Sequence, residues 1–281
     1  MTDCISILGL GLMGGSLGLA LKQFAPSIRV AGYARREETR VAAISLGAVD
    51  DAFPDPVEAA RGAGIVIACV PVQTIPRIVR AAIPGLSPGA VMTDVGSTKA
   101  KLCAELSAEV SEAGGRFVGS HPIAGSELQG LDAARADLYR GAVVIVTPGE
   151  NEKDQAALVS RMWATMGATV VSMRPEEHDR MLAKTSHLPH MVAVTLAASV
   201  AQGGEFENKS VFCGPGFHDT TRVAAGSPQV WLDILRTNQE GVYRELASFR
   251  DHLDQVLSWL DEKDFDALDS FLKASKKAKE R

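Results

Sequence analysis

The sequence predicts an α/β protein in two parts: a doubly wound parallel sheet over residues 1–174, followed by an all-α domain over residues 175–281. Short apolar segments alternate with helical patterns as far as Ser172, which is typical of repeated strand–helix–strand units. Strand patterns stop at Arg174-Pro175, and patterns of helical period then continue to the C-terminus. A glycine-rich turn after the first strand also fits a doubly wound sheet.

The individual elements follow from the spacing of apolar residues. The expected strands are a short one at the start of residues 4–24, then Ile28–Tyr33, Gly64–Val70, Ala90–Asp94, Arg116–Ser120, Ala142–Val146 and Thr169–Ser172. The expected helices between them are Arg36–Leu46, Ile75–Ile83, Lys99–Ala113 and Glu152–Met166. In the second part we expect helices over residues 176–201, Pro228–Leu260 and Lys263–Ala278. Pro189 should kink the first of these, because proline lacks the backbone N–H that a helix interior needs.

The turn after the first strand has the pattern G-x-G-x-x-G at Gly9, Gly11 and Gly14. Gly9 permits a tight turn, Gly11 lets a pyrophosphate approach the backbone, and Gly14 allows close packing of helix on strand. The following helix offers free N–H groups and a positive dipole end to phosphates. The sequence therefore predicts a Rossmann-type dinucleotide site. Its expected residues are Gly9, Leu10, Gly11, Leu12, Met13, Gly14, Ala34, Arg35, Arg36, Val70, Pro71 and Ser97.

The end of the second strand indicates which dinucleotide is preferred. A carboxylate at this position binds the ribose 2′-hydroxyl of NAD, but here the sequence is Tyr33-Ala34-Arg35-Arg36. The two guanidiniums are suited to a 2′-phosphate, which favours NADP and leaves NAD possible. The alternative is that Arg35 and Arg36 are solvated and paired with Glu37 and Glu38.

The stretch from Gly119 to Glu127 places an imidazole, two hydroxyls and a carboxylate within nine residues. We expect His121 to leave the sheet at the carboxyl edge of a strand, where such sheets bind ligands. An imidazole there can take a proton from a substrate hydroxyl at neutral pH. The alternative is a loop histidine that hydrogen-bonds a neighbouring carbonyl. Ser97, in the turn after another strand, either caps the next helix or donates to His121 or to a substrate hydroxyl.

The helical part adds further candidates. Ser186 and His190 are four residues apart, so they can share a helix face. Arg222 follows a glycine-bracketed turn and can clamp a carboxylate with its planar fork, unless it pairs with Asp219. The simplest interpretation of His178-Asp179 is an exposed pair near a helix start. The apolar stripe on the last long helix fits a core or a dimer interface. Its residues are Val242, Leu246, Phe249, Leu253, Val256 and Leu260.

Composition excludes several classes of protein. A net charge of −5 gives no support for a nucleic-acid or anionic-membrane partner. The longest apolar runs are much shorter than the roughly 20 residues that a membrane span needs. Four scattered cysteines form no C-x-x-C pair or cluster with histidine, and no signal peptide is evident. We therefore expect a soluble cytoplasmic protein with reduced thiols, and no metal site.

Five motifs in order resemble the prephenate/arogenate dehydrogenase family of tyrosine biosynthesis. They are GLGLMG at 9–14, DVGSTK at 94–99, GSHPIAGSE at 119–127, SHLPH at 186–190 and GFHDTTRVA at 216–224. The resemblance covers nearly the whole chain. It implies oxidative decarboxylation of a cyclohexadienol: a hydride goes to NAD(P), CO2 leaves, and the ring becomes a phenol. The products would be 4-hydroxyphenylpyruvate from prephenate and tyrosine from arogenate.

The resemblance also implies roles for particular residues. His121 would polarise or deprotonate the ring hydroxyl, and Ser97 would hydrogen-bond both His121 and that hydroxyl. His190 and Arg222 would hold the substrate carboxylates, with Ser186 in support. Glu127 corresponds to a position at the mouth of the site, and His178-Asp179 to a pair involved in access. The family's helical domains form a homodimer, which the long C-terminal helices of this chain are suited to.

Two other functions remain as alternatives. A β-hydroxyacid dehydrogenase shares the glycine fingerprint, but it carries a catalytic lysine followed three residues later by asparagine. Here Lys184 is followed at that distance by His187. A non-catalytic NADPH-binding sensor is the second alternative, and it predicts cofactor binding without turnover. The sequence leaves open the choice between prephenate and arogenate, and any feedback inhibition by tyrosine.

Overall fold

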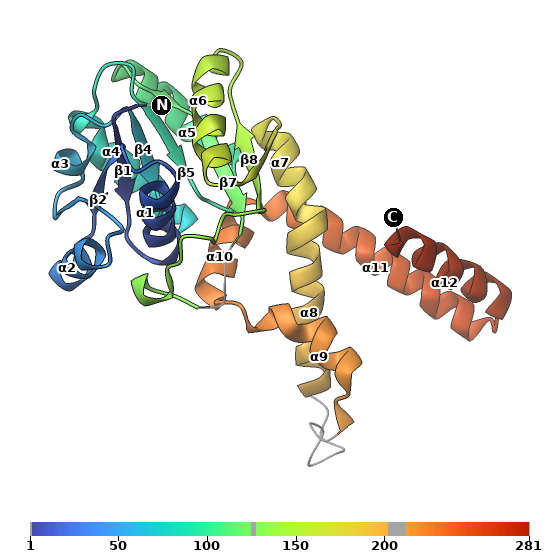
Figure 1. The fold of residues 1–281 in the computed structure, drawn as a ribbon. Helices are drawn as coiled ribbons and strands as arrows, with labels where there is room; N and C mark the ends of the chain where they lie inside the picture. Colours follow the sequence, from blue (N-terminus) through green and yellow to red (C-terminus); the bar gives the residue numbers. More distant parts are fainter. Residues whose placement is uncertain (1, 125–127, 202–211, 281) are drawn as a thin grey trace.

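The computed structural model describes residues 2–124, 128–201 and 212–280 (Figure 1). Its larger sheet is parallel throughout, with strand order β3-β2-β1-β4-β5-β6. The strands are β1 Cys4–Leu8, β2 Arg29–Tyr33, β3 Asp51–Phe53, β4 Ile65–Ala68, β5 Val91–Asp94 and β6 Arg116–Phe117. The order reverses between β1 and β4, which creates the crevice where such sheets bind ligands. The predicted fold class is confirmed.

Helices cover both faces of this sheet, so its central strands are buried along their length. These helices are α1 Leu12–Phe24, α2 Glu37–Ser45, α3 Pro56–Ala60, α4 Ile75–Ala82 and α5 Ala100–Glu112. Alternate residues of β1 enter different cores: Ile5 and Ile7 join one, and Leu8 joins the other. Strand β3 and helix α3 were not predicted, because elements of three and five residues carry little periodicity.

A second, three-stranded sheet contains β7 Gly119–Ile123, β8 Val143–Thr147 and β9 Thr169–Ser172. Helix α6, Lys153–Thr165, connects β8 to β9. Strand β7 is antiparallel to β8, and β8 is parallel to β9. The predicted single strand Arg116–Ser120 is therefore wrong, because the chain changes sheets there. The Val118 N–H still bonds to Met92 of β5, whereas the Ser120 N–H bonds to the Asp94 side chain and pairing passes to β8.

This change of sheet corrects the expected position of His121. The residue lies within β7, opposite Ile145, and not in a loop after a strand. Pro122 is tolerated beside it because β7 is an edge strand of its sheet, where a missing N–H costs little. Since Ser120 is held by Asp94 at the end of β5, His121 still lies beside the carboxyl end of the parallel sheet.

The helical part begins with α7 Pro175–Leu182, a π-helical turn Ala183–His187, and α8 Leu188–Ala201. Together they form one long, nearly continuous helical segment (Figure 1). The predicted disturbance at Pro189 takes the form of the π turn just before it. The wider turn accommodates a residue that lacks an N–H and whose ring would clash with the carbonyl four residues earlier.

The remaining helices are α9 Pro215–Thr221, α10 Pro228–Thr237, α11 Gln239–Asp261 and α12 Phe265–Lys279, with a 3₁₀ turn Arg222–Ala225 after α9. The prediction of one helix over Pro228–Leu260 is wrong. Asn238 interrupts it with φ −129°, and its side-chain amide donates to the Asp179 carbonyl of α7 over 2.8 Å. Helices α11 and α12 form a hairpin that extends away from the sheets (Figure 1). Within the described ranges, no helix is long and apolar enough to cross a membrane.

Candidate active site

The glycine turn after β1 has the geometry that a dinucleotide needs. Gly9 has φ +116°, and its N–H donates to the Tyr33 carbonyl of β2 over 3.0 Å. A Cβ on Gly14 would collide with the Gly9 carbonyl, so only glycine lets α1 pack this closely. A Cβ on Gly11, in contrast, would meet nothing within 4 Å, which leaves open space beside its backbone. Gly9 therefore matches the tight turn, Gly14 the close packing of helix on strand, and Gly11 the approach of a phosphate.

The other expected cofactor residues surround this turn. Leu10 is buried against Gly32 of β2, while Leu12 and Met13 are half-buried at the start of α1. Val70 lies directly against Gly9, and Pro71 follows it on the surface after β4. All of them lie at the carboxyl ends of β1 and β4, on either side of the crevice.

Arg35 and Arg36 are exposed at the end of β2, and neither forms an ion pair with any described residue. The alternative of pairing with Glu37 and Glu38 is thus not seen. Arg40 donates to the carbonyls of Ala34 and Arg35, both over 3.0 Å, and so holds the turn that presents the two guanidiniums. The two cations therefore lie exposed at the carboxyl end of β2.

His121 is 8% exposed, and its Nδ1 lies 2.8 Å from Nε2 of His178. The alternative of a bond to a neighbouring carbonyl is therefore wrong. Among the described residues, the contact with His178 is the one hydrogen bond of the His121 ring, and it leaves Nε2 unbonded. Burial, followed by the charges of His178, Lys99 and His187, holds the pKa of His121 well below its usual value. The imidazole is consequently neutral near pH 7, with one nitrogen held by the protein.

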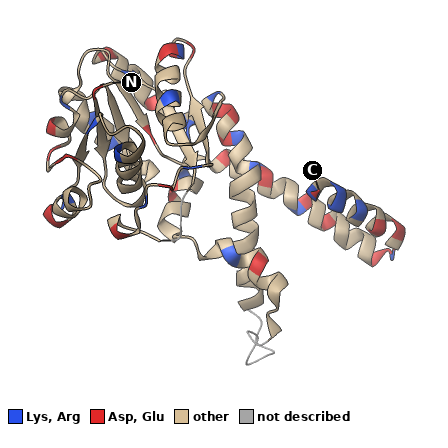
Figure 2. Cartoon of the chain, viewed as in Figure 1, with Lys and Arg blue, Asp and Glu red and all other residues tan. Residues whose placement is uncertain are grey.

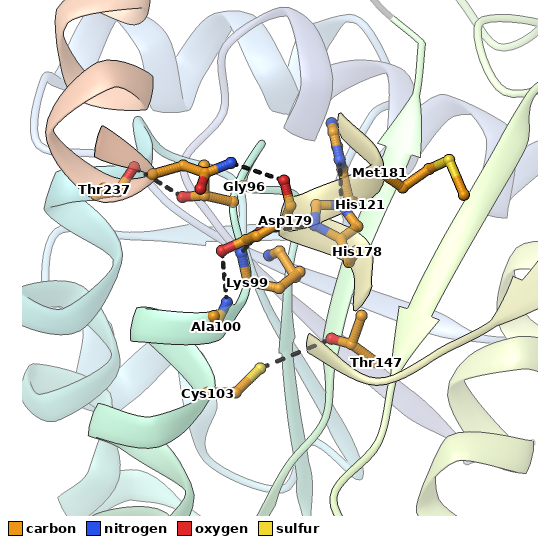
Figure 3. Close-up of polar contacts among 12 residues, drawn as sticks. Gly96, Lys99, Ala100, Cys103, His121, Thr147, His178, Asp179, Met181 and Thr237 are labelled. Carbon is orange, nitrogen blue, oxygen red and sulfur yellow. Dashed lines mark hydrogen bonds and ion pairs between the residues drawn. The ribbon is translucent and has the colours of Figure 1, made fainter. Parts of the chain in front are cut away.

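His178 and Asp179 are buried, so their reading as an exposed pair is wrong. His178 Nδ1 lies 2.8 Å from Asp179 Oδ1, and the Asp179 carboxylate accepts the N–H groups of Lys99 over 2.8 Å and Ala100 over 2.9 Å. Asp179 therefore caps α5 from the other part of the chain. Figure 3 shows the continuous line of contacts from Ala100 through Asp179 and His178 to His121.

Ser97 does not have the contacts expected of it. It is half-buried, and its hydroxyl makes no hydrogen bond to His121 or to any other described residue. Helix α5 has no capping side chain from this turn, because Asp179 already occupies its first N–H groups. Thr98 instead donates to the Thr237 hydroxyl of α10 over 2.8 Å, which ties the turn to the helical part.

A buried ion pair lies behind His121. The Lys99 ammonium donates a hydrogen bond to the Asp94 carboxylate, and both side chains are fully buried. Asp94 also accepts the N–H groups of Gly96 over 2.7 Å and Ser120 over 3.1 Å. This pair therefore fixes the end of β5 against β7 and adds a positive charge near the two imidazoles. Lys99 belongs to the motif DVGSTK, but the motif alone predicts no role for it.

His190 and Arg222 belong to neighbouring elements, because the 3₁₀ turn of Arg222 packs on α8. His190 is 4% exposed and stacks on Trp231 of α10, with ring centroids 3.4 Å apart and planes 8° apart. Its Nδ1 is buried without a hydrogen-bond partner in the described part of the chain. Arg222 is exposed and makes no ion pair with Asp219 or another described residue. Ser186 is half-buried in the π turn that precedes α8.

The structure thus unites some predicted residues and leaves others apart. It joins His121 to His178 and Asp179, and no local pattern predicts this contact, since the two histidines are 57 residues apart. Trp231 was also missed, because an aromatic residue at helical spacing is most often part of a core. Glu127 lies outside the described residues. Those residues include no group of three or more His, Cys, Asp or Glu side chains that could hold a metal ion.

Comparisons with known proteins agree with this geometry. The family model for the nucleotide-binding domain of prephenate dehydrogenase matches residues 17–172. The model for the dimerization domain of the same family matches residues 174–274. The prephenate dehydrogenase of Bacillus subtilis is 35% identical over 98% of this chain and 75% of its own length.

Two solved structures are similar along almost the whole chain. The first is prephenate dehydrogenase from A. aeolicus in complex with hydroxyphenyl propionate and NAD+, with TM-score 0.88 and 32% identity over 98% of this chain and 96% of that one. The second is Synechocystis arogenate dehydrogenase, with TM-score 0.86 and 30% identity over 99% of both chains. On the match of both family models and of these relatives, the chain belongs to the prephenate dehydrogenase family.

Proposed function

We propose that this chain oxidises prephenate, arogenate or both, to 4-hydroxyphenylpyruvate and tyrosine respectively, with loss of CO2 and hydride transfer to a nicotinamide. One observation carries the proposal: His121 is a buried neutral imidazole with one nitrogen held by His178 and the other unbonded among the described residues. It lies at the carboxyl end of the dinucleotide-binding sheet, so a hydroxyl placed there has a base beside it.

His121 begins the reaction by taking the proton of the ring hydroxyl. When bound, the oxidised nicotinamide supplies the acceptor for the hydride that leaves the carbinol carbon, where a C=O bond forms. The bond from the ring to its carboxylate then breaks, its electron pair enters the ring, and CO2 departs. The carbonyl oxygen becomes a phenolate, to which His121 returns the proton. Atoms and charge balance without a further reactant.

The substrate carboxylates require cationic and neutral donors, and the helical part supplies both. The Arg222 guanidinium has no ion pair with any described residue, so its fork is available for a carboxylate. His190 has a buried nitrogen without a partner in the described ranges, and a ligand oxygen would satisfy it. We assign Ser186 to the same end of the substrate, Ser97 to its hydroxyl, and Glu127 to the mouth of the site.

The cofactor is a nicotinamide dinucleotide, and we propose that NADP is preferred over NAD. The glycine turn of Gly9, Gly11 and Gly14 holds the pyrophosphate at the start of α1. Arg35 and Arg36 then bind the 2′-phosphate, because no carboxylate stands at the end of β2 and neither guanidinium is engaged in an ion pair within the described chain.

The β-hydroxyacid dehydrogenase alternative requires a lysine and an asparagine that act together. Lys184 is exposed, and His187 three residues later is buried against Asn238 and Trp231. This arrangement does not favour that chemistry. The sensor alternative has no observation in its favour, since a held imidazole with a free nitrogen serves no purpose in binding alone.

We also propose a division of the chain at residue 174, with dinucleotide binding before it and substrate binding and homodimer formation after it. Helix α8 has no Lys, Arg, Asp or Glu, and most of its length is at least partly exposed (Figure 2). Such a helix needs a cover, and a second copy of the chain supplies it. Helix α11 carries further exposed apolar side chains, at Leu253, Leu257 and Leu260. Cys4, Cys69 and Cys103 are buried and form no disulfide, which supports a cytoplasmic location.

The test is reduced-nicotinamide absorbance with purified protein, in which prephenate and arogenate are crossed with NAD and NADP. Turnover in at least one combination is expected, with NADP giving the higher kcat/KM. Arg35→Ser should lower the NADP preference by about tenfold or more, through loss of a charge-assisted bond, whereas Arg61→Ser on the same domain should not. Absence of turnover in all four combinations, with NADPH still bound, would contradict the proposal and favour the sensor.

A further inference from the structure

The Asp179 carboxylate determines where His178 carries its hydrogen. Both oxygens of Asp179 accept bonds: Oδ1 from the Lys99 N–H and Oδ2 from the Ala100 N–H. These two groups lie at the N-terminus of α5, whose dipole favours a negative charge. An ionised carboxylate has no hydrogen to give, so the 2.8 Å contact with His178 requires the imidazole to donate from Nδ1.

His178 is neutral, which leaves its other nitrogen as an acceptor. Burial lowers the pKa of His178, and the nearby Lys99 ammonium acts in the same direction, against Asp179 and Asp94. A neutral imidazole with hydrogen on Nδ1 has a lone pair on Nε2. That atom lies 2.8 Å from Nδ1 of His121, so His121 must donate from Nδ1.

We propose that His178 and Asp179 are positioning residues that hold His121 as the Nδ1–H tautomer, so that its Nε2 is the atom that accepts the substrate proton. The proposal rests on the proposed function, since it concerns the base of that reaction. It also gives the buried Asp179 a purpose besides capping α5. The order of groups is carboxylate, imidazole, imidazole, substrate hydroxyl.

The same arrangement stabilises the charge that forms during the reaction. Transfer of the hydroxyl proton to Nε2 makes His121 an imidazolium, whose Nδ1–H donates to His178 and through it to the Asp179 carboxylate. The proton stays on His121 until CO2 leaves, and it then returns to the phenolate oxygen. Lys99 and His187 oppose the charged form, while Asp179 is the anion aligned with it.

A first test observes the tautomer directly and needs no substrate. The chain has six histidines, so nitrogen-15 labelling of histidine gives a tractable spectrum, in which two-bond proton–nitrogen correlations distinguish a protonated ring nitrogen from a bare one. His121→Asn assigns the signal. We expect His121 to carry its hydrogen on Nδ1 at pH 7.5. The tautomer with hydrogen on Nε2 should be at most a minor population. A hydrogen found on Nε2 would overturn the inference.

A second test removes the partner of His121. His178→Phe keeps a ring of similar size but accepts no hydrogen bond. We expect a mixture of His121 tautomers and a fall in kcat of about ten- to a hundredfold, with cofactor affinity unchanged. His178→Gln, whose amide oxygen can accept from Nδ1, should restore part of kcat. His252→Gln on the exposed surface of α11 serves as the control.

The outcomes separate this inference from the proposed function. If the wild-type enzyme turns over while His178→Phe keeps both its kcat and the His121 tautomer, the inference is wrong and the function stands. If His178→Phe does not fold, His178→Gln and the wild-type spectrum still decide the tautomer. A wild-type enzyme without turnover would instead contradict the proposed function, whatever the spectrum of His121.

Discussion

His121 and His190 are both buried, at 8% and 4% exposure, but the surroundings of their rings differ. Nδ1 of His121 is held by His178, which is held in turn by Asp179. His190 is placed by an aromatic surface, since it stacks on Trp231, and its Nδ1 has no partner in the described part of the chain. Side-chain hydrogen bonds position the first ring, whereas the second is positioned by its stack on Trp231 and by the Val223 backbone.

This difference indicates a difference in task. A buried polar atom without a partner costs about 1–3 kcal/mol, and folded proteins retain such atoms mainly where something else completes them. His178 satisfies Nδ1 of His121, so the hydrogen on that ring is placed before substrate arrives. Nδ1 of His190 is left to form a hydrogen bond with a ligand. We infer that the first site determines kcat and the second determines substrate affinity.

The largest expected effect comes from His121→Asn. Asparagine is polar and smaller, but it cannot accept a proton near pH 7, so kcat should fall by about a hundred- to ten-thousandfold. Substrate KM and NADPH affinity should change little, because neither depends on the base. Steady-state kinetics and a fluorescence titration with NADPH measure the two. A variant with unchanged kcat would show that His121 is not the base. The division of tasks between His121 and His190 would then be wrong.

A smaller effect of the opposite kind is expected from His190→Phe. Phenylalanine preserves the stack on Trp231 but offers no polar atom to a carboxylate. Substrate KM should rise by about ten- to a hundredfold, the loss expected for one hydrogen bond to a charged group, with a much smaller change in kcat. Thermal stability should be equal or higher, since a buried unpaired nitrogen is removed.

His190→Ala separates the stack from the polar contact. Alanine removes both, so this variant should lose thermal stability as well as substrate affinity. Melting temperatures of the two variants, recorded without substrate, give the comparison. If His190→Phe keeps the wild-type KM, then Nδ1 of His190 does not meet the substrate, and the role assigned to this end of the site is wrong.

Local features of the fold were predictable from the sequence. The roles of Gly9, Gly11 and Gly14 depend on the backbone of one turn, which the flanking strand and helix patterns locate. The strand Thr169–Ser172 and the change to helices after Arg174-Pro175 depend on periodicity alone. In each case the residues that determine the conformation are adjacent in the chain.

Apart from the short β3 and α3, the errors arise from contacts between distant segments. Asn238 ends α10 because its amide reaches the carbonyl of Asp179, so no local pattern marks the break. The strand at His121 changes sheets because Ser120 is bound by Asp94. His178 belongs to the site because α7 packs against α5. In that contact Asp179 binds Ala100, which is 79 residues away in the sequence. Such pairings require the folded chain.

The last prediction concerns His187, which lies between the two sites. Its ring is 6.0 Å from Trp231, and its Nδ1 is 3.4 Å from the Asn238 amide that also bonds to the Asp179 carbonyl. Burial lowers the pKa of His187 to about 4. Because its usual pKa is 6.5, the unfolded chain binds a proton between pH 6.5 and 4 that the folded chain does not. Stability is therefore complete above pH 6.5 and is lost as the pH falls.

For His187 alone, this linkage amounts to about 2 kcal/mol of unfolding free energy at pH 5. Urea unfolding at pH 7.5 and pH 5 measures it in the wild type, where His121, His178 and His190 add losses of the same sign. His187→Gln cannot titrate, so its stability should fall less between the two pH values. An equal fall in both proteins would mean that His187 is protonated in the folded state at pH 5. The packing around His187, which joins the stacked ring to the hydrogen-bonded one, would then tolerate a charge.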